Sequence, residues 1–258
     1  EKPEPEAAEM PAVLIMDIET APMLTYNWQP KTDYITADKM IRDWYVICWS
    51  AMWWDDDRVM GDCIHRNEIP SNFEKQRNDK RISASLWQLF DDADVVIAQN
   101  GIKFDFLKMN SRWWLHRNYR PSSYKIIDTL QSARRNLGQS YNSLDELAAF
   151  LGIGRKLKTD MKLWRDCDHG DQASLDRMQE YCGHDVELLR DVYKAMIPMI
   201  PNHPNFAAYS KAEGVCPACL DSSIKRLPAN YHAVVKEYAE YRCNRCGSIW
   251  HSRKAEMR

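Results

Sequence analysis

The sequence predicts an α/β layer fold followed by a small C-terminal domain, and three observations support this prediction. Apolar runs rich in Val, Ile and Trp gather in the first half of the chain, as expected for buried strands. Segments with helical periodicity are interleaved with these runs and dominate the second half. A proline-rich stretch near residue 200 then interrupts the pattern. With 258 residues, of which 45% are hydrophobic, the chain can bury a full core.

Continuous apolar stretches predict the strands, and apolar residues spaced three and four apart predict the helices. The expected strands are 12–18, 44–54 and 93–99, with weaker ones at 58–65 and 124–130. The expected helices are 83–91, 103–115, 143–151 and, with the clearest period, 174–197. Ser143 and Glu146 form a capping-box pattern at the start of the third helix. No element is predicted for residues 21–43, and a connection of this length is typical of functional loops.

Prolines divide the chain in two. Pro198, Pro201 and Pro204 come at and after the end of the last predicted helix and prevent its continuation, so a linker is expected there. The predicted organisation is a flexible N-terminal segment at 1–10, a main domain at 11–200, a linker at 201–212 and a small domain at 213–258.

The formal net charge of −2 is unevenly distributed. Residues 211–258 hold nine Lys or Arg and five Asp or Glu, a balance of +4, which leaves 26 against 32, or −6, for the rest. An acidic body with a basic tail can bind nucleic acid if metal ions neutralise an acidic site. The acidic, proline-bearing start has no apolar signal region, and no stretch approaches the roughly 18 apolar residues of a membrane span. A cytoplasmic protein without a membrane partner is therefore expected.

Four of the eight cysteines are scattered singly, and the other four form two C-x-x-C pairs near the end of the chain. This layout is typical of reduced thiols and a metal site rather than of a disulfide framework. The two pairs predict a zinc ribbon with one structural Zn²⁺ held by Cys216, Cys219, Cys243 and Cys246. His232 or His251 is an alternative ligand. The role of the ribbon stays open between stabilising a short segment, binding nucleic acid and docking a partner.

The stretch VLIMDIET, residues 13–20, ends a buried strand with two carboxylates, Asp17 and Glu19. Acid-x-acid pairs are about as frequent in this sequence as chance allows, so the pair alone means little. Its position is informative, because residues two apart share one face of a strand and both carboxylates directly follow the buried part. Two like charges placed there repel each other and resist desolvation unless a cation joins them. The pair is therefore a candidate metal site.

The last predicted helix carries a carboxylate within its apolar stripe. Asp185 fills a gap in that stripe, and Tyr181 lies one turn earlier on nearly the same face. An Asp in this position either pairs with a cation or binds a metal. A core Tyr beside a salt-bridged Asp is the simpler alternative. The rest of the stripe consists of Met178, Cys182, Leu189, Val192 and Met196.

A third candidate lies in VVIAQNGIKFDFLKM, which reads as a buried strand, a turn at Asn100 and Gly101, and a helix. Asp105 falls in the first turn of that helix, where acidic residues are common because they favour the helix dipole. The flanking Phe104 and Phe106 are either core residues or residues that stack on a base.

Taken together, these three stretches resemble the DEDD superfamily of 3′-5′ exonucleases, whose fold is of the ribonuclease H type. Order and rough spacing agree across about residues 12–197, and the resemblance implies a mixed sheet flanked by helices. The Tyr four residues before the last Asp resembles the DEDDy subclass, which includes proofreading domains of DNA polymerases and the ribonuclease D group. The matches are D-x-E at Asp17 and Glu19, N-x-x-x-F-D from Asn100 to Asp105, and Y-x-x-x-D from Tyr181 to Asp185.

The resemblance implies hydrolysis that uses two Mg²⁺ or Mn²⁺ ions, which prefer hard oxygen ligands such as these carboxylates. One ion, held by Asp17, Glu19 and Asp185, would activate the attacking water. The other, shared by Asp17 and reached by Asp105, would stabilise the leaving 3′ oxygen. Tyr181 would orient the water as a hydrogen-bond donor, because an ordinary tyrosine has a pKa of about 10. The expected products are nucleoside 5′-monophosphates.

The expected substrate is single-stranded DNA with a 3′ end, because nothing in the sequence reads a 2′-hydroxyl. The basic stretch GRKLKTDMKLWR, residues 154–165, either follows a phosphate backbone or forms a solvated face. The residues expected to contact nucleic acid are Ile18, Thr20, Asn100, Phe104, Lys156, Lys158, Lys162 and Arg165. An RNA-trimming exonuclease of the ribonuclease D kind and an inactive nucleic-acid-binding scaffold are the alternatives. A polymerase or another replication or repair protein is the expected protein partner.

Overall fold

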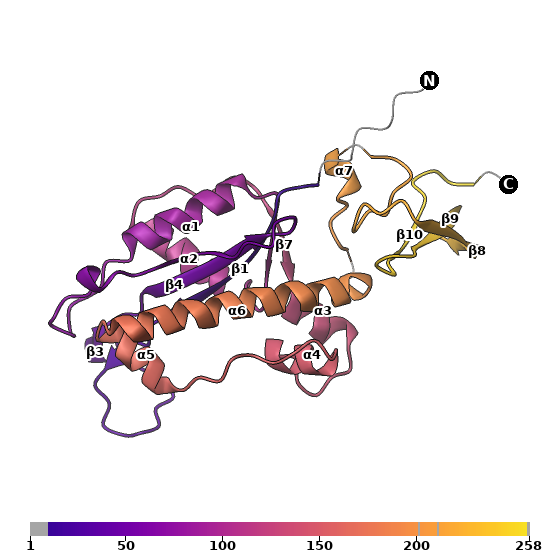
Figure 1. The fold of residues 1–258 in the computed structure, drawn as a ribbon. Coiled ribbons are helices and arrows are strands. Elements are labelled where there is room, and N and C mark those ends of the chain that lie inside the picture. The colour runs from indigo at the N-terminus through magenta and orange to yellow at the C-terminus, as the bar shows by residue number, and fades with distance from the viewer. Residues whose placement is uncertain (1–9, 201, 211, 257–258) are drawn as a thin grey trace.

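A five-stranded mixed sheet forms the centre of the fold (Figure 1). Its strands are β1 (Val13–Thr20), β4 (Val46–Trp53), β5 (Met60–Cys63), β6 (Val95–Ala98) and β7 (Lys125–Asp128). They lie in the order β5, β4, β1, β6, β7, with β1 antiparallel to β4 and parallel to β6. The computed structural model describes residues 10–200, 202–210 and 212–256.

Helices cover both faces of this sheet (Figure 1). The helix α6 (Gln172–Met196) crosses β1 and β4 on one face, and α1 (Lys80–Asp92) and α2 (Asp105–Leu115) pack on the other. Leu14 and Met16 of β1 belong to the core cluster that includes α1 and α2, whereas Val13 and Ile15 pack with the C-terminal half of α6. The shorter helices are α3 (Thr129–Asn136), α4 (Leu144–Phe150), α5 (Met161–Asp168), α7 (Ala207–Ser210) and the 3-10 turns η1 (Ala37–Lys39), η2 (Arg66–Glu68) and η3 (Ile197–Met199).

The structure confirms the α/β class with its mixed sheet, and it confirms all five predicted strands and all four predicted helices to within a few residues at each end. The helices α3 and α5 were missed, because eight residues show little periodicity and neither helix opens with the Ser-x-x-Glu pattern that marks the seven-residue α4. The connection 21–43 holds η1 and a two-stranded sheet of β2 (Leu24–Thr25) and β3 (Met40–Arg42). Of the flexible segment expected at 1–10, residues 1–9 lie outside the described residues.

The capping box expected at the start of α4 forms only in part. The Ser143 hydroxyl accepts a hydrogen bond from the Glu146 backbone N–H at 3.3 Å. The Glu146 carboxylate instead pairs with Arg155 at 2.8 Å, which ties α4 to the basic loop before α5. Among the described residues, no helix combines the length and the apolar character needed to cross a membrane.

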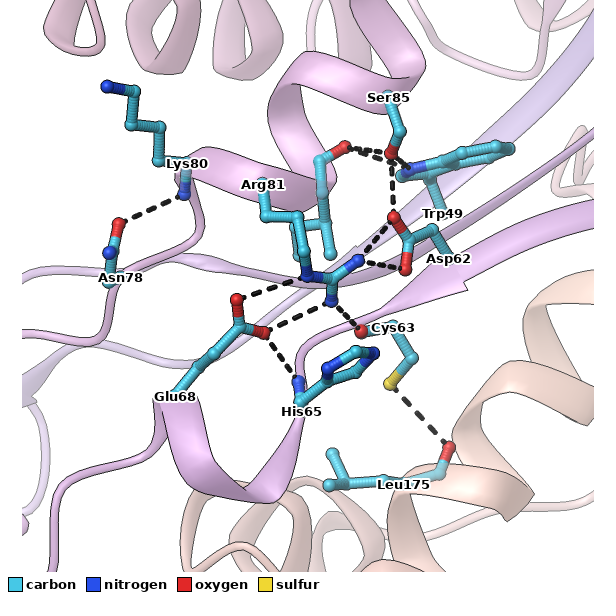
Figure 2. A network of polar contacts seen from close by, with 11 residues as sticks. Trp49, Asp62, Cys63, His65, Glu68, Asn78, Lys80, Arg81, Ser85 and Leu175 are labelled. Carbon is cyan, nitrogen blue, oxygen red and sulfur yellow. Dashed lines mark hydrogen bonds and ion pairs between the residues drawn. The ribbon is translucent and has the colours of Figure 1, made fainter.

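An ion-pair network attaches the edge strand β5 to α1 (Figure 2). The Arg81 guanidinium lies 2.6 Å from Asp62 Oδ1 and 3.1 Å from Glu68 Oε2, and it donates to the Cys63 carbonyl at 2.6 Å. The Ser85 hydroxyl donates to the same Asp62 carboxylate at 2.8 Å. The network holds β5 beside β4, whose other neighbour is β1.

The C-terminal part of the chain forms a second, three-stranded antiparallel sheet. Its strands are β8 (Ile224–His232), β9 (Glu237–Cys243) and β10 (Ile249–His251), with β9 in the middle. This small domain lies beyond the C-terminal end of α6 (Figure 1), and Cys216 and Phe206 share a core cluster with Tyr193 of that helix. The Tyr193 hydroxyl also contacts His203 Nε2 at 2.7 Å. The stretch expected as a linker, 201–212, thus contributes a fully buried Phe206 to a core that joins both parts.

Candidate active site

Three carboxylates converge where α6 crosses β1. Asp17 and Glu19 lie on one face of β1, and Asp185 faces them from α6, where only 1% of its surface is exposed. One oxygen of each carboxylate lies within 4.8 Å of the other two. Cys182, one turn before Asp185, contacts the Asp17 carbonyl with its Sγ at 3.5 Å and helps to fix the crossing. The crossing therefore brings three acidic groups within reach of a single cation.

Asp105 is buried beside this group at the first position of α2, with only 2% of its surface exposed. Its Oδ1 accepts a hydrogen bond from the backbone N–H of Ile18 at 3.2 Å, between Asp17 and Glu19 in the chain. Asp105 does not belong to the group of three, but after burial its charge is among the causes that raise the pKa of both Asp17 and Glu19. The structure thus gathers all four predicted carboxylates in one place.

Burial makes the ionisation of these acids costly. Desolvation, followed by the Cys182 thiol and the other carboxylates, holds the pKa of Asp17 well above its ordinary value. Desolvation also raises the pKa of Glu19 to about 7, although the charge of Lys156 opposes this. Burial likewise raises the pKa of Asp105 to about 7, although hydrogen bonds from two backbone N–H groups oppose this. Acids of this kind are all ionised at neutral pH only when positive charge is brought among them.

Lys156, from the loop before α5, supplies one positive charge. Its Nζ lies 2.7 Å from Asp185 Oδ2 and 5.0 Å from the centre of the Tyr181 ring. Although burial opposes it, the Asp185 carboxylate raises the pKa of Lys156, so this amine is protonated. Burial raises the pKa of Asp185, although this ion pair and a side-chain hydrogen bond from Tyr181 oppose the rise. A buried carboxylate next to two more carboxylates fits a hard divalent cation.

Tyr181 stands at the edge of the carboxylate group, one turn before Asp185 on α6. It is 7% exposed, and its ring meets Trp164 edge to face with 6.0 Å between ring centres. Burial raises the pKa of Tyr181 to about 12. Its hydroxyl is therefore protonated at neutral pH and can donate a hydrogen bond to a water or a phosphate oxygen.

Two pockets flank the carboxylates and share Lys156 as a common wall. The larger has a volume of about 890 Å³, and its lining includes Thr20, Met23, Trp44, Lys108, Lys158, Trp164 and Tyr181. The smaller has a volume of about 520 Å³, and its lining includes Asp17, Asn100, Arg134, Tyr141 and Asp185. The carboxylates thus lie between two openings, one rich in aromatic side chains and one polar.

The residues expected to contact nucleic acid are divided between the pockets and other places. Thr20, Lys156 and Lys158 line the larger pocket, and Asn100 lines the smaller one. The Ile18 side chain is buried in the core, and only its N–H takes part in the site.

The other three of these residues are exposed. Phe104 is 37% exposed before α2, with the Lys108 amine 4.9 Å from its ring centre. Lys162 forms an exposed ion pair with Asp166 on α5, and Arg165 is exposed on the same helix. Neither of these two side chains lines the pockets beside the carboxylates.

The pocket residues that sequence reasoning missed include Trp44, Lys108, Arg134 and Trp164. The Lys108 amine lies 3.8 Å from the centre of the Trp44 ring, and these two come from segments 64 residues apart. A hydrogen bond from Trp164 is among the causes that lower the pKa of Glu19 against its burial. The only local signal was the position of Trp164 inside the basic stretch 154–165, since the other three are brought to the site by folding alone.

The four cysteines of the C-terminal domain form a second candidate metal site. Their Sγ atoms all lie within 4.8 Å of one another, with 3.7 Å between Cys216 and Cys246 and 3.6 Å between Cys219 and Cys243. Four sulfurs placed tetrahedrally at the usual Zn–S distance would be about 3.8 Å apart. The backbone N–H of Cys246 also points at Cys243 Sγ at 3.5 Å. The arrangement fits Zn²⁺.

The histidines considered as alternative zinc ligands lie elsewhere. His251 stacks on Tyr231 with 4.6 Å between ring centres, and His232 Nδ1 faces Glu237 at 3.4 Å. The ligand group found in the described part of the chain consists of the four cysteines.

Comparison with known families identifies the superfamily to which this fold belongs. A model of the RNase_H superfamily matches residues 56–197, which is more than half of the chain. The chain belongs to the RNase H superfamily. The matched stretch contains Asp105, Tyr181 and Asp185, whereas Asp17 and Glu19 precede it. Membership of the RNase H superfamily supports a nuclease-type function, and nucleases of this type use divalent metals.

Among solved structures, this RNase H superfamily protein is similar to the family B DNA polymerase from the hyperthermophilic archaeon Pyrobaculum calidifontis. The two share 16% sequence identity with a TM-score of 0.50, over 73% of this chain and 25% of the polymerase chain. At this identity the likeness shows a shared fold, and this chain corresponds to about a quarter of the polymerase. No curated protein matches the sequence.

The metal-free form of this RNase H superfamily protein should lose stability as the pH rises from 5 to 8. The folded-state pKa of Glu19 and of Asp105 is raised to about 7, above the ordinary values of 4.5 and 3.8. The protonated acids therefore favour the folded state below their ordinary pKa, and this contribution is lost as the pH passes through about 7. Thermal melting should show a larger rise in Tm on adding Mg²⁺ or Mn²⁺ at pH 8 than at pH 5.

The double variant Asp17→Asn/Asp185→Asn is the control for this prediction, because it keeps the side-chain shapes and removes two charges. It should lose most of the metal-dependent rise at pH 8. An equal rise at both pH values, or an undiminished rise in the variant, would show that the ions bind elsewhere.

Proposed function

We propose that this protein is a metal-dependent 3′-5′ exonuclease of the DEDDy subclass that hydrolyses single-stranded DNA and releases nucleoside 5′-monophosphates. The observation that carries the proposal is the convergence of Asp17, Glu19 and Asp185 within 4.8 Å, with Asp105 buried beside them. These acids occur in the order and on the elements that the resemblance requires, and Tyr181 stands one turn from Asp185. Domain 11–200 would carry this activity, and 213–258 would be a zinc ribbon.

In this proposal Asp17, Glu19 and Asp185 hold the metal ions, and Asp105 contributes from beside β1. Two Mg²⁺ or Mn²⁺ ions, when bound, would supply a nucleophilic water at neutral pH and stabilise the charge on the leaving 3′ oxygen. Asp185 is well placed as a ligand, because it is 1% exposed and one of its oxygens lies within 4.8 Å of oxygens of both Asp17 and Glu19. Asp105 is held by the Ile18 N–H, which limits its freedom to reach an ion directly.

Tyr181 and Lys156 position the reacting groups. With its pKa raised to about 12, the Tyr181 hydroxyl acts as a donor and not as a base, so it orients the attacking water or the scissile phosphate. The protonated Lys156 amine attracts a phosphate to the carboxylate group, which would otherwise repel it. Once metal ions neutralise Asp185, that amine is free to contact a phosphate oxygen.

The two pockets suggest how the 3′ end is held. The larger pocket offers the indole rings of Trp44 and Trp164 to a terminal base, with Lys158 as a basic group at its wall. The smaller pocket offers Arg134 and Asn100 to the phosphate on the opposite side of the carboxylates. The likeness to a family B DNA polymerase is our reason for proposing DNA, and for proposing a polymerase or another replication or repair protein as a partner.

The test is degradation of single-stranded DNA and RNA of matched sequence, each labelled at its 5′ end, with Mg²⁺, Mn²⁺ or neither. We expect a metal-dependent ladder that shortens from the 3′ end and is stronger on DNA. A stronger ladder on RNA would favour the RNA-trimming alternative. Cleavage at internal positions would overturn the exonuclease assignment, and tight binding without cleavage would favour an inactive scaffold.

A further inference from the structure

The C-terminal sheet of β8, β9 and β10, called the ribbon sheet below, has one face toward the cysteine cluster and one face toward solvent. Because side chains alternate along β9, Ala239 and Cys243 lie on the inner face, where they are 4% and 1% exposed. The register of the three strands then assigns the residues opposite them. The outer ribbon face consists of Lys225, Tyr231, Tyr238, Glu240, Arg242, Ile249 and His251.

Three aromatic rings form a cluster on this outer ribbon face. Tyr231 and His251 stack with 4.6 Å between ring centres and 9° between planes, and Tyr238 lies 5.3 Å from His251. Tyr231 is 44% exposed, so this stack meets solvent within the described part of the chain. An exposed, flat π surface is the group that the bases of a single strand recognise, because every base has a π face.

Positive charge accompanies the rings. Lys225 and Arg242 are cross-strand neighbours on the outer ribbon face, and both are exposed. Among the described residues, the ion pairs of the ribbon involve other side chains, namely Arg226, His232 and Arg245. Four thiolates and one Zn²⁺ would change the formal charge of residues 211–258 from +4 to +2, which is still opposite in sign to a phosphate backbone.

We propose that the outer ribbon face binds single-stranded nucleic acid, with bases stacked on Tyr231 and His251 and phosphates beside Lys225 and Arg242. A protein partner suits this face less well, because Ile249 is its only large aliphatic side chain and charged residues are depleted in the centre of protein interfaces. The inference extends the proposed function, but binding at this face does not require hydrolysis.

The position of the ribbon sets a minimum length for an oligonucleotide that contacts both the carboxylates and the outer ribbon face. The ribbon packs against the C-terminal end of α6, and Met196 is eleven residues beyond Asp185. At the rise of an α-helix, these residues span about 16 Å along the axis. A short oligonucleotide held at the carboxylates therefore ends before the ribbon, whereas a long one reaches both sites.

The experiment measures binding of fluorescein-labelled dT20 and dT4 by anisotropy, using the full chain with Asp17→Asn so that hydrolysis is blocked. Adding Tyr231→Ala and Arg242→Gln should weaken dT20 binding by about tenfold and leave dT4 binding unchanged. The matched control is Arg226→Gln, which removes one exposed positive charge from the opposite face of the same sheet, because Arg226 lies across from Tyr241 in the register. Zinc content and Tm of each variant show that the ribbon stays folded.

Each outcome decides the proposal. Unchanged dT20 affinity in a folded, zinc-loaded variant overturns it, and so does an equal loss for dT4 and dT20 or an equal effect of Arg226→Gln. A change of molar mass in solution on Tyr231→Ala overturns it in favour of a contact between copies of this chain. If the ribbon variant loses dT20 binding but the wild-type protein hydrolyses no DNA, the ribbon site is supported and the exonuclease is refuted. If the wild-type protein hydrolyses DNA but the ribbon variant binds dT20 normally, the exonuclease is supported and the ribbon site is refuted.

Discussion

Replacing Asp17 or Asp185 by asparagine should lower the rate of hydrolysis by on the order of a thousandfold or more, because each variant removes a charged ligand from the proposed shared metal site. Asparagine keeps the shape of aspartate, so packing at the crossing of β1 and α6 is preserved. The pKa of both acids is raised by burial, which means that their charges disfavour the folded metal-free protein. Both variants should therefore melt at or above the wild-type temperature at pH 8 without added metal.

Glu180→Gln is the matched control for this prediction. Glu180 lies on the same helix as Asp185 and next to Tyr181, but its side chain is 61% exposed and pairs with Arg177 at 2.8 Å. Its removal should leave both the rate and the Tm almost unchanged, since an exposed ion pair contributes little. Full activity in folded Asp17→Asn or Asp185→Asn protein would exclude that residue from the mechanism. Loss of activity together with a large fall in Tm would point to a structural role.

The candidate acids could be predicted from the sequence because each carries a local signal. The two-residue period of β1 places Asp17 and Glu19 on one face, and a break in a helical stripe reveals Asp185. Their approach to within 4.8 Å could not be derived from any of these patterns, because it depends on how α6 crosses the sheet. The resemblance to a known family supplied that step.

Lys156 shows where sequence patterns stop being informative. The basic stretch 154–165 predicts either residues that follow a phosphate backbone or a solvated face, and its members separate in the structure. Lys156 turns inward to Asp185, whereas Lys162 and Arg165 lie exposed on α5. An irregular loop has no period that assigns its side chains to a face, so its conformation is set by contacts such as the pair between Arg155 and Asp145 at 2.7 Å.

If the cysteines hold zinc as proposed, replacing Cys216 or Cys243 by serine should release it and lower the Tm by on the order of 10 °C or more, or produce a separate early transition. Zn²⁺ would hold together a domain that has few other buried residues, and both thiols are almost completely buried, at 0% and 1% exposure. The effect should extend to α6, because Cys216 shares a core cluster with Tyr193 of that helix. Metal analysis and calorimetry of the purified chain measure both quantities.

Cys63→Ser is the control for the zinc prediction, since Cys63 is a partly buried thiol of β5 outside the cysteine cluster. It should retain zinc and melt close to the wild-type temperature. The zinc site and the carboxylate site are also separable, because thiolates select the softer Zn²⁺ and carboxylates select Mg²⁺ or Mn²⁺. A zinc-free ribbon variant that still cleaves DNA at low temperature would therefore assign the cysteines to stability. Wild-type protein that contains no zinc, yet melts well above the Cys216→Ser variant, would show that the thiols stabilise the fold without a metal.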